Sequence, residues 1–168
     1  MTMPSWLPPL VLFKDYGSDW TRYIEAVYEF FKKDFVDSQP FLEKMPVYLL
    51  IKEPKEQNKE PTFWHMTSQN LKNTGSEDDR TPAFERCERI RWPRPIIDNR
   101  KDPLVKVWEN ERSKGRRNLL LWFNDEYLVI LVKKRTFLLL MTAYPIEEGH
   151  QRRKLEREFQ EYCRTRNP

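Results

Sequence analysis

Three apolar runs in the last third of the chain constrain its fold more than any other feature. Each run has the length of a β-strand, and the breaks between them, at residues 124–126 and 133–135, contain only three polar residues each. Because breaks this short allow only hairpin connections, the sequence predicts a three-stranded antiparallel meander over residues 118–146. The runs are apolar at nearly every position, so both faces of the sheet should be covered, at least at the middle strand.

The rest of the chain supplies helices to cover that sheet. Apolar residues at helical spacing predict an amphipathic helix at residues 19–36 and a final helix at 149–166. The first residues are rich in proline, so we predict an N-terminal arm at 1–18 and a single domain at 19–168. The predicted fold class is α+β, with helices packed on an antiparallel sheet, a C-terminal three-stranded meander and then a C-terminal helix.

The segments between the first helix and the meander are shorter and more mixed. Short strands are predicted at residues 10–13, 47–51 and 62–67, and a polar loop is predicted at 70–80. Thr81-Pro82 is typical of a helix start, with threonine as the N-cap and proline at the first helical position. A helix is therefore predicted from Thr81 to Pro93, and a second short helix from Asp102.

Composition excludes several classes of site. Two cysteines and two histidines are too few for a disulfide framework or a zinc site, so neither a metal nor a cofactor is expected. No segment approaches the 18 consecutive apolar residues of a membrane span. The N-terminus has no basic region before its proline-interrupted apolar part, which argues against a signal peptide. We therefore expect a cytoplasmic protein without a membrane partner.

The positive charge is concentrated in the middle of the chain. Residues 86–117 hold 11 Lys and Arg against five Asp and Glu, whereas the whole chain has a net charge of only +4. Such a segment favours an anionic partner, of which nucleic acid is the commonest, although a solvated charged face is the alternative. The basic turns provide the candidate RNA-binding residues, which are Arg112, Lys114, Arg116, Arg117, Lys133, Lys134 and Arg135.

Several polar residues interrupt otherwise apolar segments and are candidates for chemistry. His65, flanked by large apolar residues, is either a general acid or base or a satisfied, partly buried imidazole. Thr142 and Tyr144 point to one face of their strand, where they either orient a substrate or make ordinary strand-end and core contacts. Arg86 and Arg91 border the apolar stripe of a predicted helix, where they either stabilise a pentavalent phosphate or pair with glutamates.

Together these residue types are those of a metal-independent ribonuclease. Such an enzyme needs a base for the ribose 2′-OH, cations that stabilise the phosphorane, and an acid that protonates the 5′-oxygen of the leaving group. The reaction requires no metal ligands, which agrees with their scarcity in this composition.

The chain also resembles a known group of nucleases. The motifs that carry the resemblance are residues 63–67, 86–92 with 96–97, 107–112, 127–131 and 140–146. They are similar to the phage- and mobile-element-associated nucleases of the barnase–EndoU–colicin–RelE-like group. The resemblance implies helices before a four-stranded antiparallel sheet, with an RNA site on the sheet and its loops. It also implies metal-independent endoribonuclease activity that leaves a 2′,3′-cyclic phosphate. Carried over by position, the implied catalytic set is His65, Arg86, Arg91, Thr142 and Tyr144.

Three functions remain open on this basis, one of which is a host–phage interaction module recognised through its aromatic surface. An RNA-cleaving toxin or phage-conflict protein would need an antitoxin or immunity protein as a partner. The alternative is a phage- or mobile-element-encoded regulator that binds nucleic acid or a protein on the same fold without catalysis. A catalytic function requires His65, Arg86 and Thr142 to converge on one cleft.

Overall fold

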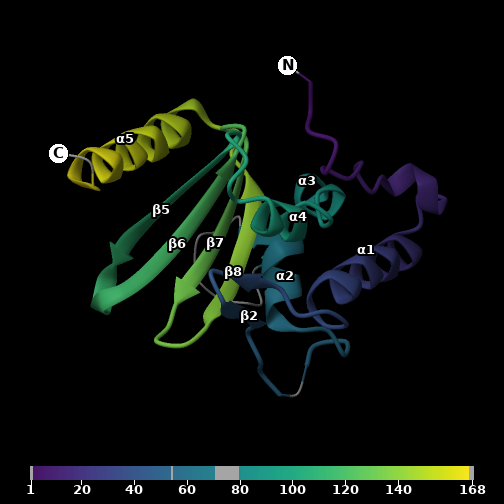
Figure 1. The fold of residues 1–168 in the computed structure, drawn as a ribbon. Helices are drawn as coiled ribbons and strands as arrows, with labels where there is room; N and C mark the ends of the chain where they lie inside the picture. The colour runs from purple at the N-terminus through teal and green to yellow at the C-terminus, as the bar shows by residue number, and fades with distance from the viewer. Residues whose placement is uncertain (1, 54, 71–79, 167–168) are drawn as a thin grey trace.

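The predicted meander lies within a six-stranded sheet of strand order β1-β2-β8-β7-β6-β5 (Figure 1). The computed structural model describes residues 2–53, 55–70 and 80–166, apart from the side chain of Ser113. The meander consists of β6 (Arg116–Phe123), β7 (Tyr127–Lys133) and β8 (Leu138–Pro145). They pair antiparallel, and most of β7 is buried, so the prediction of a meander covered on both faces is confirmed.

The two edges of the sheet were predicted less well. On one side, β5 (Val105–Arg112) pairs antiparallel with β6, so the short helix predicted from Asp102 is wrong. On the other side lie β1 (Phe41–Leu42) and β2 (Met45–Leu49), which confirms a strand close to the predicted position. β2 runs parallel to β8, with Val47 opposite Leu138. The sheet is therefore mostly antiparallel, with one parallel pair.

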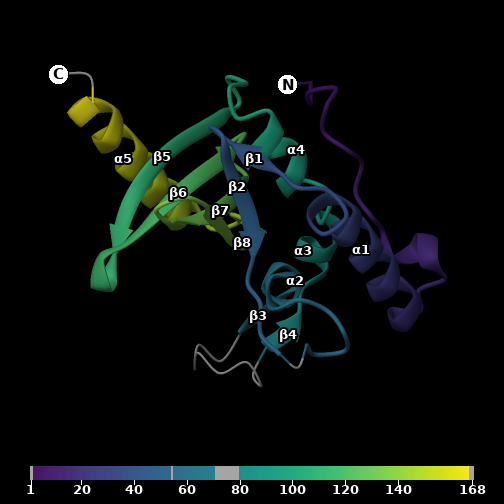
Figure 2. The same ribbon diagram turned by 60° about the horizontal axis from the view of Figure 1, so that its bottom comes forward.

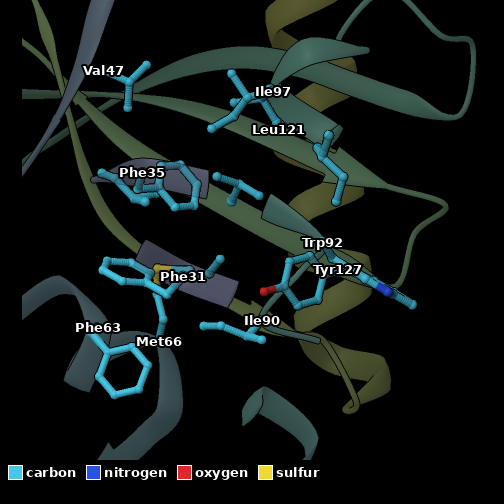
Figure 3. Packing of buried hydrophobic residues seen from close by; sticks show 14 of the residues in the cluster. Phe31, Phe35, Val47, Phe63, Met66, Ile90, Trp92, Ile97, Leu121 and Tyr127 are labelled. Carbon is cyan, nitrogen blue, oxygen red and sulfur yellow. The ribbon is translucent and has the colours of Figure 1, made fainter. Parts of the chain in front are cut away.

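Four helices cover one face of this sheet (Figures 1 and 2). These are α1 (Trp20–Phe35), α2 (Pro61–Thr67), α3 (Phe84–Glu88) and α4 (Pro93–Asp98). The prediction of α1 is confirmed, including Asp19 as its N-cap, whose side chain accepts a hydrogen bond from the Arg22 amide. Figure 3 shows Phe31 of α1 and Met66 of α2 in the main core with Tyr127 of the sheet. The helical layer thus encloses a core rich in aromatic rings.

The C-terminal helix covers part of the opposite face. α5 (Gly149–Arg166) has the predicted bounds and packs Leu155 into a second cluster with Trp108 and Trp122. The Trp108 indole donates a 2.8 Å hydrogen bond to Glu158 Oε1, which ties α5 to β5. The predicted α+β architecture, with its final helix after the strands, is therefore confirmed.

Two local predictions near the middle of the chain are wrong. Residues 62–67 form helix α2 rather than a strand, because Pro61 starts a helix whose Phe63 and Met66 both enter the main core. Thr81 and Pro82 belong to strand β4 (Arg80–Pro82), which pairs antiparallel with β3 (Ser68–Asn70). They therefore do not start a helix. Most of the loop predicted at 70–80 lies outside the described residues.

The N-terminal arm packs against the domain. Val11 is buried, and the Trp6 indole donates a 2.9 Å hydrogen bond to Asp102 Oδ2. The strand predicted at residues 10–13 is wrong, since Phe13–Tyr16 form a short 3-10 helix, η1. Another short turn of this kind, η3 (Ser113–Gly115), joins β5 to β6. Among the described residues, no helix has the length and apolar character needed to cross a membrane.

A buried hydroxyl on α2 helps to join this helix to the sheet. Thr62 is fully buried, its Oγ1 accepts from the Leu50 amide at 2.9 Å, and it donates to the Leu140 carbonyl at 3.2 Å. It therefore bridges the chain after β2 and the edge of β8, next to the point where the two strands separate. This contact positions α2 against β8.

We predict that Thr62→Val destabilises the protein by about 1–3 kcal/mol, because it removes the side-chain partner of the partly buried Leu50 amide and one hydrogen bond to the buried Leu140 carbonyl. Urea unfolding followed by tryptophan fluorescence measures the change in free energy. Thr67→Val is the matched control, since the Thr67 hydroxyl bonds only within α2, to Phe63 O at 2.9 Å. An equal loss in both variants would contradict a special role for the bridge.

Candidate functional site

A polar hollow of about 500 Å³ lies where the end of α2 meets β8. Its walls come from α2, the β3–β4 pair, α3, β8 and the first turn of α5. The lining residues are His65, Gln69, Asn70, Arg80, Arg86, Met141, Thr142, Tyr144 and Gln151. No Asp or Glu is among these described residues, and two of them are arginines. The described lining is therefore suited to an anionic ligand.

A β-bulge shapes the floor of the hollow. Ile130 pairs with Thr142, whereas the next residue of β7, Leu131, pairs with Leu140, so Met141 is the extra residue on β8. Bulges of this kind bend a strand and redirect its side chains, and they recur beside functional sites. Here Met141, Thr142 and Tyr144 all reach the same hollow.

Three donors converge on one main-chain oxygen at the end of α2. The His65 carbonyl accepts from Arg86 Nη1 at 3.0 Å, from Arg80 Nη2 at 3.3 Å and from Thr142 Oγ1 at 3.1 Å. The two arginines also share the Ser68 carbonyl, at 3.0 Å and 2.6 Å. Cations at the C-terminal end of a helix interact favourably with its dipole, which helps to hold both guanidinium groups here.

The charges of these two arginines are close enough to interact. Burial, and then the neighbouring charge of Arg80, lower the pKa of Arg86 from its ordinary value. Arginine nevertheless stays protonated in proteins, so the hollow keeps a dense positive charge. Nη2 and Nε of Arg86 donate to no oxygen among the described residues, which leaves those groups available to a ligand.

Tyr144 forms a wall beside Arg86. The Arg86 guanidinium lies 4.9 Å from the centre of the Tyr144 ring, a cation–π contact. Burial raises the pKa of the Tyr144 hydroxyl, so this group remains a neutral hydrogen-bond donor over the physiological pH range. A neutral phenol beside the Arg86 guanidinium can donate to a phosphate oxygen.

The structure brings four of the five implied catalytic residues together, and it places Arg91 elsewhere. His65, Arg86, Thr142 and Tyr144 all line the hollow. The Arg91 guanidinium instead lies 4.8 Å from the centre of the Phe30 ring, on α1. Burial of the Asp34 carboxyl raises its pKa to about 6, and the nearby charge of Arg91 opposes this rise. Arg91 therefore serves the contact between α1 and the segment after α3.

The candidate RNA-binding residues lie mainly on two hairpin turns at one end of the sheet. All are exposed, and they comprise Arg112, Lys114, Arg116, Arg117, Lys133, Lys134 and Arg135. Lys133 forms a 3.2 Å ion pair with Glu109. Arg112 lies 3.9 Å from Glu158 of α5 and lines a smaller hollow beside Tyr144. Arg112, at the β5 end of the first turn, therefore lies close to the polar hollow, which Tyr144 also lines.

Sequence reasoning missed five residues of the lining, of which Arg80 and Gln151 are the clearest examples. Arg80 stood in a stretch predicted as a polar loop, and its role appears only through the pairing of β4 with β3. Gln151 is one of several polar residues in the first turn of α5, and only the position of that helix places it at the hollow. Neither residue carries a local signal, because long-range packing creates both positions.

The described residues contain no cluster of three or more His, Cys, Asp or Glu that could hold a metal ion. Comparisons of the chain with protein-family models, curated proteins and solved structures found no match. The function is therefore inferred from the geometry of the site.

We predict that Arg86→Ala weakens binding of pyrophosphate by about 10-fold or more, because it removes a charge-assisted donor from the hollow. Isothermal titration calorimetry at constant ionic strength measures the affinity. Arg91→Ala removes the same charge at a distant place and should leave the affinity unchanged. Equal weakening in both variants would mean that net charge alone, and not the hollow, binds the anion.

Proposed function

We propose that this protein is a metal-independent endoribonuclease that cleaves RNA by attack of the ribose 2′-OH. The observation that supports the proposal is the convergence of His65, Arg86, Thr142 and Tyr144 on one hollow whose described lining contains no carboxylate. These residues come from three elements that are far apart in sequence. Their side chains are of the types that the reaction requires.

In this proposal each side chain has a distinct task. His65 would take the proton from the 2′-OH or give one to the departing 5′-oxygen. The 2′-oxygen would attack phosphorus while the bond to the 5′-oxygen breaks, which yields a 2′,3′-cyclic phosphate and a 5′-hydroxyl. Arg86, through its available Nη2 and Nε, would stabilise the extra negative charge of the phosphorane, with Arg80 adjacent. Thr142 and Tyr144 would orient the substrate.

One observation favours a second function, nucleic-acid binding without catalysis. The hydrogen bonds that Arg86 and Thr142 make go to main-chain carbonyls at the end of α2. Donors of this kind satisfy the last carbonyls of a helix and hold it in place. In a purely binding protein the same groups would fix α2 and present a positive surface.

The proposed biological setting follows from the proposed chemistry. An enzyme that cleaves cellular RNA acts in the cytoplasm and is toxic to its host unless it is controlled. We therefore propose a toxin-like or phage-conflict role, with an antitoxin or immunity protein as the controlling partner.

We predict that the purified protein cleaves total RNA in the presence of EDTA and leaves 2′,3′-cyclic phosphate ends. His65→Ala should lower the rate by about 100-fold or more, which is the usual contribution of a general acid or base. Gel electrophoresis and end-group analysis by mass spectrometry provide the readout.

The other histidine provides the matched control. His150 is exposed and lies 3.0 Å from Glu148 at the start of α5, so His150→Ala should leave cleavage unchanged. Loss of activity on chelation would overturn the metal-independent mechanism. Unchanged RNA with the parent protein, together with retained RNA binding, would favour the non-catalytic alternative.

A further inference from the structure

A second, smaller hollow adjoins the polar one. It has a volume of about 110 Å³, and Tyr144 and Gln151 line both hollows. Its other walls come from the end of β5, from β7 and from the start of α5. Because two side chains belong to both linings, the hollows are adjacent, with Tyr144 and Gln151 at their boundary.

The chemistry of the second hollow differs from that of the first. Leu128, Ile146 and Leu155 give it an apolar floor, and all three belong to the cluster beneath α5. Its cations are Arg112 and Lys154. An apolar floor beside a tyrosine ring suits the flat face of a nucleobase, whereas cations suit the phosphate that follows it.

Arg112 is positioned for this task by α5. Glu158 Oε1 accepts hydrogen bonds from Trp108 and Asn110, and Glu158 Oε2 lies 3.9 Å from Arg112 Nη2. That distance is too long for a hydrogen bond, and the Arg112 side chain is 43% exposed. Arg112 is thus oriented by a charge and still accessible from solvent.

Tyr144 lies between two cations. Burial raises the pKa of the Tyr144 hydroxyl, and the charges of Arg86 and Arg112 both act in the opposite direction. Arg86 belongs to the polar hollow and Arg112 to the smaller one. Successive phosphates of a single strand would therefore meet a cation on each side of the tyrosine.

We propose that the smaller hollow is a subsite for the nucleotide next to the scissile phosphate, and that it accepts an unpaired base. The inference rests on the proposed ribonuclease function, since that function supplies RNA as the substrate. The base would lie on the apolar floor beside Tyr144, Gln151 would hydrogen-bond to its edge, and Arg112 with Lys154 would bind the next phosphate. A base that is stacked in a duplex cannot enter such a hollow, so the substrate is single-stranded RNA.

The test uses a probe that cannot be cleaved. A fluorescein-labelled single strand of about ten nucleotides with 2′-O-methyl riboses lacks the attacking hydroxyl, and fluorescence anisotropy reports its affinity for the full chain. We expect Arg112→Ala and Lys154→Ala each to weaken binding by roughly 5- to 10-fold. Each should also lower the slope of log affinity against log salt by about 0.7 in magnitude, the effect of one lost phosphate contact.

Arg153→Ala is the matched control, because Arg153 is an exposed cation on the same turn of α5 and does not line either hollow. It should change the affinity and the salt slope little. The same probe as a duplex should bind more weakly than the single strand. Equal effects of Arg112→Ala and Arg153→Ala, or equal affinity for the two probes, would overturn the subsite.

Cleavage assays separate this inference from the function on which it rests. If the parent protein cleaves RNA but the Arg112 and Lys154 variants bind the probe normally, the subsite is wrong and the enzyme stands. If these variants lose probe binding but the parent protein cleaves no RNA, the hollow binds single strands without being part of a nuclease. Gln151→Ala, which removes an exposed amide, should alter the preference among probes of different base composition.

Discussion

Burial of the central strand on both faces is the constraint on which the rest of the structure depends. β7 is apolar along most of its length, so the sheet needs a cover on each side. Four helices and the N-terminal arm cover one face, and the single helix α5 covers part of the other. α5 starts near Tyr144 and extends toward β5. Thr142 of β8 therefore lies beside the end of α2. The polar hollow lies here, between the helices α2 and α3 on one side and the first turn of α5 on the other.

The positive charge of the hollow has a structural origin as well as a possible use. Arg80 and Arg86 satisfy carbonyls at the end of α2, and this role alone explains why two like charges lie together. Removing both arginines would take away two donors from the Ser68 carbonyl and two of the three from the His65 carbonyl. A site built in this way obtains its cations from the same contacts that hold the fold together, so the two roles are linked in any substitution.

Periodicity in the sequence predicted the elements that depend on local pattern, and it failed where distant contacts decide. The long helices α1 and α5 and the meander were predictable, because their apolar residues repeat over many positions. Residues 62–67 are too short to show a period, and their burial against α1 and the sheet selects a helix. β5 has valine and tryptophan at helix-like spacing, but its pairing with β6 makes it a strand. The same limit applies to the site: the polar types of His65, Arg86, Thr142 and Tyr144 stood out, whereas Arg80 and Gln151 required the tertiary structure.

The parallel pairing of β2 with β8 also determines the order in which the site can form. β5 to β8 are joined by short hairpins, so their contacts are local and close early in folding. The contact between Val47 and Leu138, in contrast, closes a long loop and comes at a larger cost in chain entropy. α2 follows β2 in the chain, and it reaches β8 through Thr62 and Thr142. Hence a chain still in synthesis holds no assembled hollow until β8 and the first turn of α5, which carries Gln151, have left the ribosome.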